Sequence, residues 1–477
     1  MMNSLLKKSN SVFTKAELIF KILYLLLVLL SFTNLFAKHA ALTALNYFLV
    51  AFGAVLLINR GLRLKRYIKS YACVFLILFC VSLLISAFLN REYGILESIQ
   101  SFAWTTLQFG LLYMTDSDRS PADLKREFNV LAGVFVGYIF LANLIGIGMF
   151  LANYGTFGPF SFNGNIIGFV WGRLWGVYSD PNNGSAMTSL AVVFSLGILC
   201  SPLRKKRWLS AGMIINIILS YGYIMLSDSR TGMVCIIAGV AVFLFMRFYT
   251  HSFAGKLQKP ALRAIVSMIL AVAVSVACFE SMQLVKKGYN FAIEKIIEQQ
   301  GDAAGEEDAD TPALITGRDQ ADTETDISNR RFSLWESGIE IWKTSPIFGV
   351  SQRYIKQYAL DKLPDTYMVN NDSGEFDSTH NMFLDVLVGQ GVVGLGILLA
   401  FFGSVAWLLI KRFLRDKQNI KSVYYITLFS GLVVLSCSCM FVLDVLYLNS
   451  ASTFMFWSML GLFTRLLRVS PQSSASE

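Results

Sequence analysis

Long apolar runs, separated by short polar segments, dominate the pattern of residues along this chain. A helix that spans a bilayer needs about 20 predominantly apolar residues, and twelve stretches approach that length with few charges. They lie near Leu18–Phe36, Ala40–Ile58, Tyr71–Phe88, Ile95–Met114, Phe128–Leu151, Gly184–Cys200, Leu209–Leu226, Thr231–Phe248, Ala264–Phe279, Val392–Ile410, Val423–Phe441 and Ser450–Phe463. The pattern predicts an all-α polytopic integral membrane protein of about twelve transmembrane helices, formed by residues 1–477 as a single membrane domain.

The Lys and Arg residues between these stretches predict the orientation, because cytoplasmic loops retain an excess of them. With a cytoplasmic N-terminus, the inward segments carry 26 Lys and Arg, whereas the short outward loops carry four, namely Lys38, Arg91, Arg173 and Arg230. We therefore expect a multi-pass protein of a bacterial plasma membrane, with both termini cytoplasmic and one large extracytoplasmic loop. No cleavable signal peptide is expected, because the first apolar run is long and no small-residue cleavage site follows it.

Composition supports the membrane assignment and limits the chemistry. Hydrophobic residues make up 55% of the chain and charged residues 15%, so we expect the lipid bilayer as a partner. The net charge of +9 follows the loop asymmetry, and we expect no nucleic acid. All seven cysteines fall inside predicted spans, and we interpret them as packing residues. The pair Cys437 and Cys439 has no His or second Cys pair nearby, which argues against a metal site there.

One segment is too long and too polar to be a simple connection. The predicted extracytoplasmic loop covers residues 280–391, and Glu280–His380 holds 19 of the 32 acidic residues. Its first part, residues 298–326, has ten Asp or Glu, a single Arg and no apolar periodicity. Such a composition cannot bury enough surface to fold alone. We therefore interpret 298–326 as a solvated, disordered insert that could be deleted without loss of activity.

The second part of the loop predicts a helix over Arg330–Lys343. Asp326-Ile-Ser328 offers capping side chains before it, and Pro346 with Gly349 ends it. One stripe of this helix carries Arg331, Trp335, Gly338 and Trp342. His380 follows at the membrane boundary, before a short amphipathic piece, Met382–Val388, and a Gly389-Gln-Gly391 element that opens the next span.

Two further outward segments are notable. Ser227–Gly232 is the whole connection between the seventh and eighth spans, and it places Arg230 in a first helical turn after a capping Asp228 or Ser229. A helix N-terminus favours anions, so a cation at this position suggests a function. The alternative without a function is that the Arg230 side chain extends to the lipid headgroups. Arg173–Gly184 contains Asp-Pro-Asn182-Asn-Gly. These residue types are typical of a tight turn, and the sequence supports a turn and a binding site equally.

Arg230, Arg331 and His380 are far apart in sequence but share the outward face. Arginine binds phosphate through a planar fork of donors, and two such residues suit a pyrophosphate whose lipid tail lies in the bilayer. A histidine can activate or orient a hydroxyl nucleophile. Together they indicate transfer of a glycan from a lipid diphosphate to an acceptor hydroxyl. Near these residues there is no metal-ligand spacing, Walker loop or GxGxxG motif, so we expect no metal and no cofactor.

The ordered set of motifs resembles the superfamily of O-antigen ligases and O-antigen or capsular polysaccharide polymerases. The elements are Ser229-Arg-Thr-Gly232, Arg331-Phe-Ser-Leu-Trp335 with Pro346-Ile-Phe-Gly349, and His380-Asn381 with Gly389-Gln-Gly391. Arg173 to Asn182 is similar to the family's Arg…Gly…Pro-Asn element. The resemblance covers residues 171–400 and implies a membrane glycosyltransferase with a GT-C-like fold.

The resemblance also implies roles and partners. Arg230 and Arg331 would hold an undecaprenyl-diphosphate-linked glycan, and His380 would act on or position the acceptor glycan, which is a lipid-linked repeat or lipid A core. Arg173, Trp335, Asn182 and Asn381 are further candidates for substrate binding. Arg330 precedes Arg331, and the spacing to the Trp favours the latter. A chain-length regulator is a further expected partner.

Three alternatives compete with a polymerase. A ligase would hand the glycan to lipid A core, which carries many phosphates, but the outward loop holds 19 acids against ten Lys and Arg, which favours the polymerase. A transporter is disfavoured, because the halves show no repeat and ionisable residues are nearly absent from mid-membrane, where a coupled transporter usually places them. A peptidoglycan polymerase of the shape, elongation, division and sporulation family is disfavoured by the His-Asn and Arg-x-x-x-Trp elements.

Overall fold

The computed structural model describes residues 2–37, 39–156, 165–253, 257, 259–301, 316, 330–371, 374–415, 422–441 and 445–468. Within these residues, a long helix covers each of the twelve predicted apolar stretches. These helices are α1 (Met2–Ser31), α2 (Ala40–Leu62), α4 (Cys73–Leu89), α5 (Leu96–Leu107) with its π-helical continuation η2 (Gln108–Tyr113), α6 (Pro121–Leu151), α7 (Pro181–Leu199), α8 (Arg207–Ser227), α9 (Arg230–Arg247), α10 (Pro260–Gly301), α14 (Met382–Arg415), α15 (Val423–Ser438) and α16 (Ala451–Arg468). Shorter helices are α3 (Leu64–Tyr67), η1 (Arg91–Tyr93), η4 (Pro202–Lys205), η5 (Phe248–Ser252), α12 (Arg331–Thr344), η6 (Gln352–Tyr354) and α13 (Ile355–Lys362).

Length and hydropathy identify which described helices could cross a bilayer. Seven are long and apolar enough, namely α2, α6, α7, α8, α9 with η5, α10 and α14, and two shorter apolar helices are α4 and α15. The chain is therefore an α-helical membrane protein, and twelve crossings remain a prediction. Helix α16 is not among these helices. It is buried along almost its whole length, so Ser452, Thr453 and Thr464 face protein rather than lipid.

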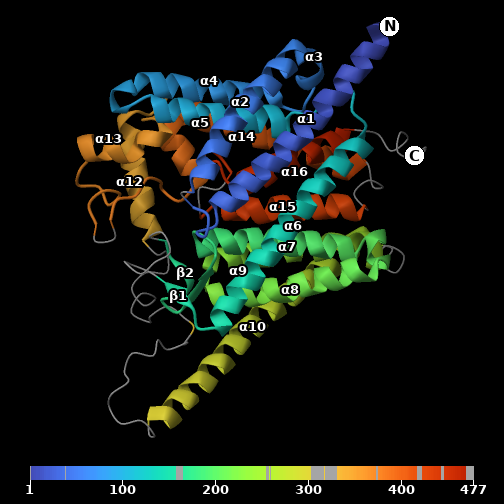
Figure 1. The fold of residues 1–477 in the computed structure, drawn as a ribbon, viewed down its shortest axis with the longest axis vertical. Helices are drawn as coiled ribbons and strands as arrows, with labels where there is room; N and C mark the ends of the chain where they lie inside the picture. The colour runs from blue at the N-terminus through green and yellow to red at the C-terminus, as the bar shows by residue number, and fades with distance from the viewer. Residues whose placement is uncertain are drawn as a thin grey trace.

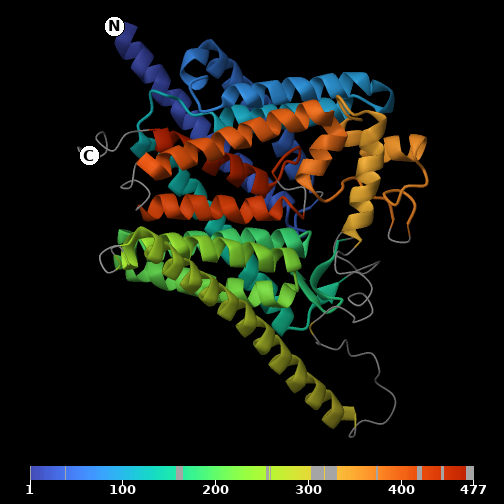
Figure 2. The same cartoon turned by 180° about the vertical axis from the view of Figure 1, so that it is seen from behind.

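The predicted inward segments gather at one end of the helix bundle. The beginning of α1 lies at that end, and α12, α13 and the strands lie at the other (Figures 1 and 2). The Arg465 guanidinium donates to the carbonyl of Ser117 at 2.7 Å, and Arg412 donates to the carbonyl of Arg468 at 3.0 Å. We call this end the terminal end and the other the α12 end. Which of them faces the cytoplasm remains the prediction made above.

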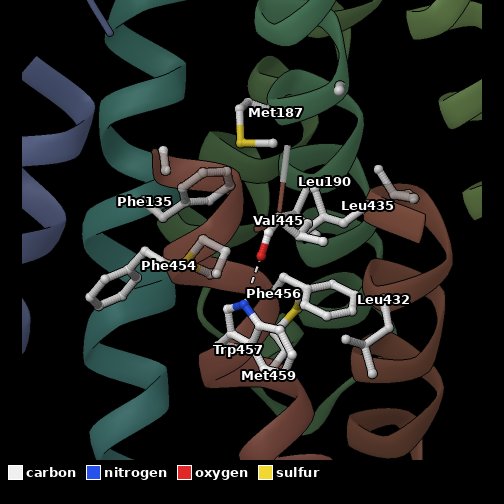
Figure 3. Packing of buried hydrophobic residues seen from close by; sticks show 14 of the residues in the cluster. Phe135, Met187, Leu190, Leu432, Leu435, Val445, Phe454, Phe456, Trp457 and Met459 are labelled. Carbon is white, nitrogen blue, oxygen red and sulfur yellow. Dashed lines mark hydrogen bonds between the residues drawn. The ribbon is translucent and has the colours of Figure 1, made fainter. Parts of the chain in front are cut away.

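The core of the bundle forms around α16. Figure 3 shows side chains of α6, α7 and α15 that meet the aromatic residues of this helix. Trp457 is completely buried, and its indole N–H donates to the carbonyl of Val445 at 2.7 Å. Its ring also contacts Phe109 with centroids 4.5 Å apart. This packing holds the helices that carry the candidate site in fixed relative positions.

The mainly helical fold also contains a small sheet that was not predicted. Strands β1 (Gly155–Thr156), β2 (Ile167–Val170) and β3 (Arg173–Gly176) form a three-stranded antiparallel sheet in the order β1-β2-β3. Val170 pairs with Arg173 across a two-residue turn in which Trp171 and Gly172 have φ of 53° and 66°. Two consecutive positive φ values match the twist of a tight hairpin. Arg173 is therefore positioned by a hairpin rather than by an irregular loop.

Helix α10 does not end at Glu280, where the large loop is predicted to begin. It continues to Gly301 and leaves the bundle at an angle (Figure 2). At about 1.5 Å per residue, its 42 residues span roughly 63 Å, about twice the thickness of a hydrocarbon core of about 30 Å. Most of the acidic insert 298–326 lies outside the described residues.

Thr316, within the insert, is hydrogen-bonded to helix α10, whereas the insert was expected to have no packing face. The backbone N–H and the hydroxyl of Thr316 donate to Asn290 Oδ1 at 2.9 Å and 2.7 Å. The Asn290 amide group in turn donates to the Thr316 carbonyl at 2.6 Å. Thr316 is 2% exposed, so this point of the insert is attached to α10.

A buried ionic network lies at the terminal end of the bundle, at the ends of the predicted spans. Lys21 lies within the predicted first span and pairs with Glu127 at 2.6 Å, and Arg119 pairs with the same carboxylate at 2.5 Å. Arg60 binds Glu17 through two nitrogens at 2.6 Å and 2.8 Å. Each buried charge thus has a partner, as burial requires.

Candidate active site

Side-chain hydrogen bonds at the α12 end join the hairpin and the start of α7 to the junction between α8 and α9, which lies more than 40 positions later in the sequence. Arg173 on β3 donates from Nε to the carbonyl of Ser227 at 2.8 Å and from Nη2 to Asn182 Oδ1 at 3.4 Å. The hydroxyl of Ser229 donates to the same Asn182 oxygen at 2.9 Å. The hairpin, the start of α7 and the junction between α8 and α9 therefore meet at Asn182.

The α8–α9 junction forms as the sequence predicts. Asp228 ends α8 in the left-handed region with φ of 49°, and Ser229 caps α9 by accepting a hydrogen bond from the N–H of Gly232 at 3.0 Å. Arg230 is the first residue of α9 and is exposed. Asp228 also forms an ion pair with Lys286 of α10 at 2.7 Å. This pair ties the turn beside Arg230 to a third helix.

The segment Asp180-Pro-Asn182-Asn-Gly begins a helix rather than forming an isolated turn. Asp180 is the N-cap of α7, and its carboxylate accepts from the N–H groups of Asn182 and Asn183 at 2.6 Å and 2.9 Å. Pro181 takes the first helical position. Asp at the cap and Pro at the next position are both typical of helix starts.

Helix α12 confirms the helix predicted over Arg330–Lys343, with a different start. The predicted cap, Asp326-Ile-Ser328, lies outside the described residues. Arg330 itself is the N-cap, in the left-handed region with φ of 62° and without a side-chain capping bond. Arg330 donates to the hydroxyl of Tyr367 at 3.5 Å, whereas the Arg331 guanidinium lies 5.4 Å from the ring centroid of Phe441. The two arginines therefore face different surroundings.

The stripe on α12 that begins with Arg331 packs on the turn that carries His380. The indole N–H of Trp335 donates to the carbonyl of Thr379 at 3.1 Å. A Cβ atom added at Gly338 would lie 2.7 Å from Thr379 Cγ2, so only glycine permits this approach. Trp342, further along the stripe, donates to the carbonyl of Pro346 instead.

The His380 turn is held by a buried carboxylate that the sequence did not single out. Asp385 is 0% exposed. It accepts hydrogen bonds from the Ser378 hydroxyl at 2.6 Å, from the Thr379 N–H at 2.7 Å and from the Thr379 hydroxyl at 2.9 Å. His380 follows with φ of 55°, and its N–H donates to Ser378 Oγ at 3.0 Å. The sequence feature that could have pointed to this carboxylate is the acidic residue Asp385 in the first turn of the otherwise apolar piece Met382–Val388.

Asn381 caps the helix that follows. Its side-chain oxygen accepts from the N–H groups of Phe383 and Leu384 at 3.0 Å and 3.2 Å. Helix α14 then breaks at Gly391, with φ of 65° and ψ of −167°, at the element predicted to open the span. This break separates the short N-terminal part of α14 from its long apolar part.

Two glycine motifs from different parts of the sequence fit together behind the His380 turn. Gly349 and Gly391 both have positive φ, and a Cβ atom added to either would lie less than 3 Å from the backbone of the other's segment. The N–H of Val392 donates to the carbonyl of Pro346 at 2.9 Å, and the N–H of Val350 donates to the carbonyl of Val388 at 2.9 Å. The Pro-x-x-Gly and Gly-x-Gly elements thereby fix α12 against the start of α14.

The charges of Arg331 and Asp180 both act on the imidazole of His380. Burial lowers the pKa of His380 below its usual value, the Arg331 guanidinium lowers it further, and the Asp180 carboxylate acts in the opposite direction. Because Asp180 caps α7 next to Asn182, the hydrogen bonds of Asn182 extend this group of residues to the Arg230 turn. The lowered pKa of His380 favours the neutral imidazole at pH 7.

The described part of the chain contains no group of three His, Cys, Asp or Glu residues that could hold a metal ion. The seven cysteines, all among the described residues, form no disulfide bonds. Cys437 and Cys439 lie at the end of α15. The carbonyl of Cys439 accepts from the N–H of Met382 at 3.1 Å, so this end of α15 supports the start of α14.

Comparisons with known proteins find relatives for the part of the chain from α8 to α14. Residues 214–399 match the family model described as O-Antigen ligase. The chain is also 23% identical over 256 residues to the exopolysaccharide production protein ExoQ of Rhizobium meliloti (strain 1021), across 52% of this chain and 49% of that protein. The chain thus spans about half the length of the curated relative it matches. The match to the family model includes Arg230, Arg331 and His380 and begins after Arg173 and Asn182, and the predicted resemblance is confirmed.

Proposed function

We propose, from the confirmed resemblance to the O-antigen ligase and polymerase superfamily, that this chain is a membrane glycosyltransferase. In this proposal it polymerises undecaprenyl-diphosphate-linked oligosaccharide repeats into surface polysaccharide, O-antigen or capsule, at the outer face of the plasma membrane. The proposal rests on the residues that gather at the α12 end of the bundle. Arg331 acts on the pKa of His380 there, and Ser229, next to Arg230, donates a hydrogen bond to Asn182.

Arg230 and Arg331 would bind the donor diphosphate. Each guanidinium offers a fork of donors that matches phosphate oxygens, and Arg230 stands at the start of α9, where free N–H groups add positive potential. During transfer, the bond between the anomeric carbon and the diphosphate oxygen breaks, and the lipid diphosphate leaves with the electron pair. Preorganised cations stabilise the negative charge that develops on it.

His380 would act on the acceptor. Its lowered pKa keeps the imidazole neutral near pH 7, so a ring nitrogen can take the proton of the acceptor hydroxyl as the oxygen bonds to the anomeric carbon. A neutral imidazole could equally orient that hydroxyl without taking the proton. The two roles differ in their pH dependence, because only a base must be neutral to accept the proton.

The other candidate substrate-binding residues are proposed mainly as positioning residues. Arg173 and Asn182 bind the α8–α9 junction and so set the direction of Arg230. Trp335 and Asn381 bind the backbone on either side of His380. The reaction needs no metal or cofactor in this proposal, and EDTA should leave the transfer rate unchanged.

The topology and partners follow the same proposal. The α12 end would be extracytoplasmic and both termini cytoplasmic, with the bilayer, the lipid-linked glycans and a chain-length regulator as partners. The region 171–400 would carry the site, with residues 280–391 as its outward part. Because α10 continues through the first part of 280–391, only the portion after this helix would be a loop.

A ligase is the second candidate, because the matching family model is described as O-Antigen ligase. Against it, the segment Glu280–His380 holds 19 acids and ten Lys and Arg, a charge that would repel a phosphorylated lipid A core. The relative's name refers to exopolysaccharide production, which agrees better with polymerisation. The test is to reconstitute the full chain with the lipid-diphosphate oligosaccharide alone. A ladder of products one repeat apart supports the polymerase, and no product until lipid A core is added supports the ligase.

A further inference from the structure

The terminal end of the bundle contains a cavity that the proposed transfer reaction does not use. It has a volume of about 320 Å³ and is lined by Leu408, Lys411 and Arg412 of α14 and by Arg468 of α16. Cavities of roughly 300–1,000 Å³ are typical of small-molecule sites. We call it the α14–α16 cavity.

The arginines of the α14–α16 cavity are held by backbone carbonyl groups. Arg412 donates from Nη2 to the carbonyl of Arg468 at 3.0 Å, and Arg468 donates to the carbonyl of Lys69. Across the part of the chain that the structure describes, neither they nor Lys411 forms an ion pair with a carboxylate. Carbonyl groups orient a guanidinium but leave its full charge. Two oriented guanidinium groups and the ammonium of Lys411 around one cavity are suited to a phosphate group.

The surroundings of the cavity are those of a membrane interface. Leu408 forms its apolar wall and is 8% exposed, while the neighbouring Trp407 and Ile410 are 63% and 52% exposed on the outer face of α14. Tryptophan is enriched at the level of lipid headgroups, and α14 is long and apolar enough to cross the membrane. The cavity therefore joins a cationic hollow to a surface that faces acyl chains.

We infer that the α14–α16 cavity binds the headgroup of an anionic phospholipid. Its phosphate lies against Lys411, Arg412 and Arg468, and its acyl chains run along Leu408 and the exposed apolar face of α14. Basic pockets between transmembrane helices bind such headgroups. A free phosphate ion has the same oxygen chemistry, but it makes no use of the apolar wall. The inference does not depend on the transferase proposal, because the cavity and the His380 turn lie at opposite ends of the bundle.

The test is a lipid titration of the delipidated full chain in a neutral detergent, followed by thermal unfolding and by native mass spectrometry. Phosphatidylglycerol should raise the unfolding temperature and remain bound in the gas phase, whereas phosphatidylcholine and inorganic phosphate should do neither. A Lys411→Gln, Arg412→Gln variant should need about tenfold or more phosphatidylglycerol for the same shift, since charge-assisted hydrogen bonds are lost. Lys411→Gln alone should show part of this effect without touching a backbone contact.

The matched control removes two cations from another basic segment, through Arg204→Gln and Lys205→Gln on η4. This variant should titrate like the unmodified chain. Equal weakening in both double variants would reduce the effect to general surface charge and overturn the inference. A full shift with inorganic phosphate alone would show a free-anion site and overturn the lipid assignment.

Discussion

The carboxylate of Asp385 accepts a hydrogen bond from the backbone N–H of Thr379 at 2.7 Å, directly before His380. The same buried carboxylate also accepts from the hydroxyls of Thr379 and Ser378. Three donors thus converge on one group inside the protein. The direction in which His380 points is set by a residue five positions later in the sequence.

Asp385→Asn should therefore lower turnover more than donor affinity. The amide can accept fewer of the three bonds and leaves buried donors unpaired, at a cost of about 1–3 kcal/mol. We expect kcat to fall by roughly 10- to 100-fold, as for a misplaced catalytic group, with KM for the lipid-linked donor nearly unchanged. Steady-state kinetics in proteoliposomes measures both constants. Asp361→Asn, an exposed acid on α13 at the same end, is the control, and a normal kcat for Asp385→Asn would remove the positioning role.

The pH dependence of transfer should reveal the state of His380. Burial and Arg331 lower its pKa, so its neutral form should persist to lower pH than in an ordinary histidine. If His380 is the base, the rate falls as pH decreases through this lowered pKa. Asp180→Asn keeps a good helix cap but removes the carboxylate that raises the pKa, so the acid limb should move to still lower pH. His380→Gln should lower the rate strongly if the residue is a base and retain much of it if the residue only orients.

A pH–rate profile of kcat/KM for the unmodified chain and Asp180→Asn decides this point. An acid limb that moves to higher pH in the variant would contradict the assigned electrostatics. A profile without any group below neutrality would exclude the base role and leave the orienting role.

The ends of the helices around the candidate site could be predicted from the sequence, because helix caps and helix breakers act on residues only a few positions away. The Ser229 cap, the start of α9 at Arg230 and the break at Gly391 all follow from such signals. The small sheet was missed because its strands have four residues or fewer. Contacts such as Lys21 with Glu127, 106 positions apart, require the fold to be known. The prediction ended the span near Glu280 because polar residues begin there. Polar residues do not end a helix, so α10 continues past this point.

Deletions within the acidic insert should separate its two parts. Removing residues 302–315, with a short Gly/Ser linker, leaves Thr316 and its bonds to Asn290 in place. Because shortening a loop changes its closure entropy by only about 1 kcal/mol, near-normal transfer is expected. Removing residues 302–322 also deletes Thr316 and should destabilise the outer part of α10, seen as faster proteolysis there. Loss of transfer in the shorter deletion, at normal expression, would indicate that the insert contacts substrate.

The orientation can be tested with small epitope tags in intact cells. Tags at residues 206 and 416 should be shielded, and a tag at residue 310 should be accessible from outside, because cationic loops stay in the cytoplasm. Permeabilised cells provide the control for tag exposure. A tag at 206 that is accessible in intact cells, together with a shielded one at 310, would reverse the topology.

The arginine clamp is the central claim, and glycan transfer by purified variants tests it most directly. Arg230→Ala and Arg331→Ala, reconstituted with lipid-diphosphate oligosaccharide at normal levels of insertion, should give no product. Arg→Lys at either position should restore little, because a point charge does not replace the planar fork. Arg330→Ala, whose side chain faces Tyr367, serves as the matched control and should retain most of the rate. We predict that both Ala variants at Arg230 and Arg331 give no product, whereas Arg330→Ala still transfers glycan. Near-normal transfer by Arg230→Ala or Arg331→Ala would contradict the account.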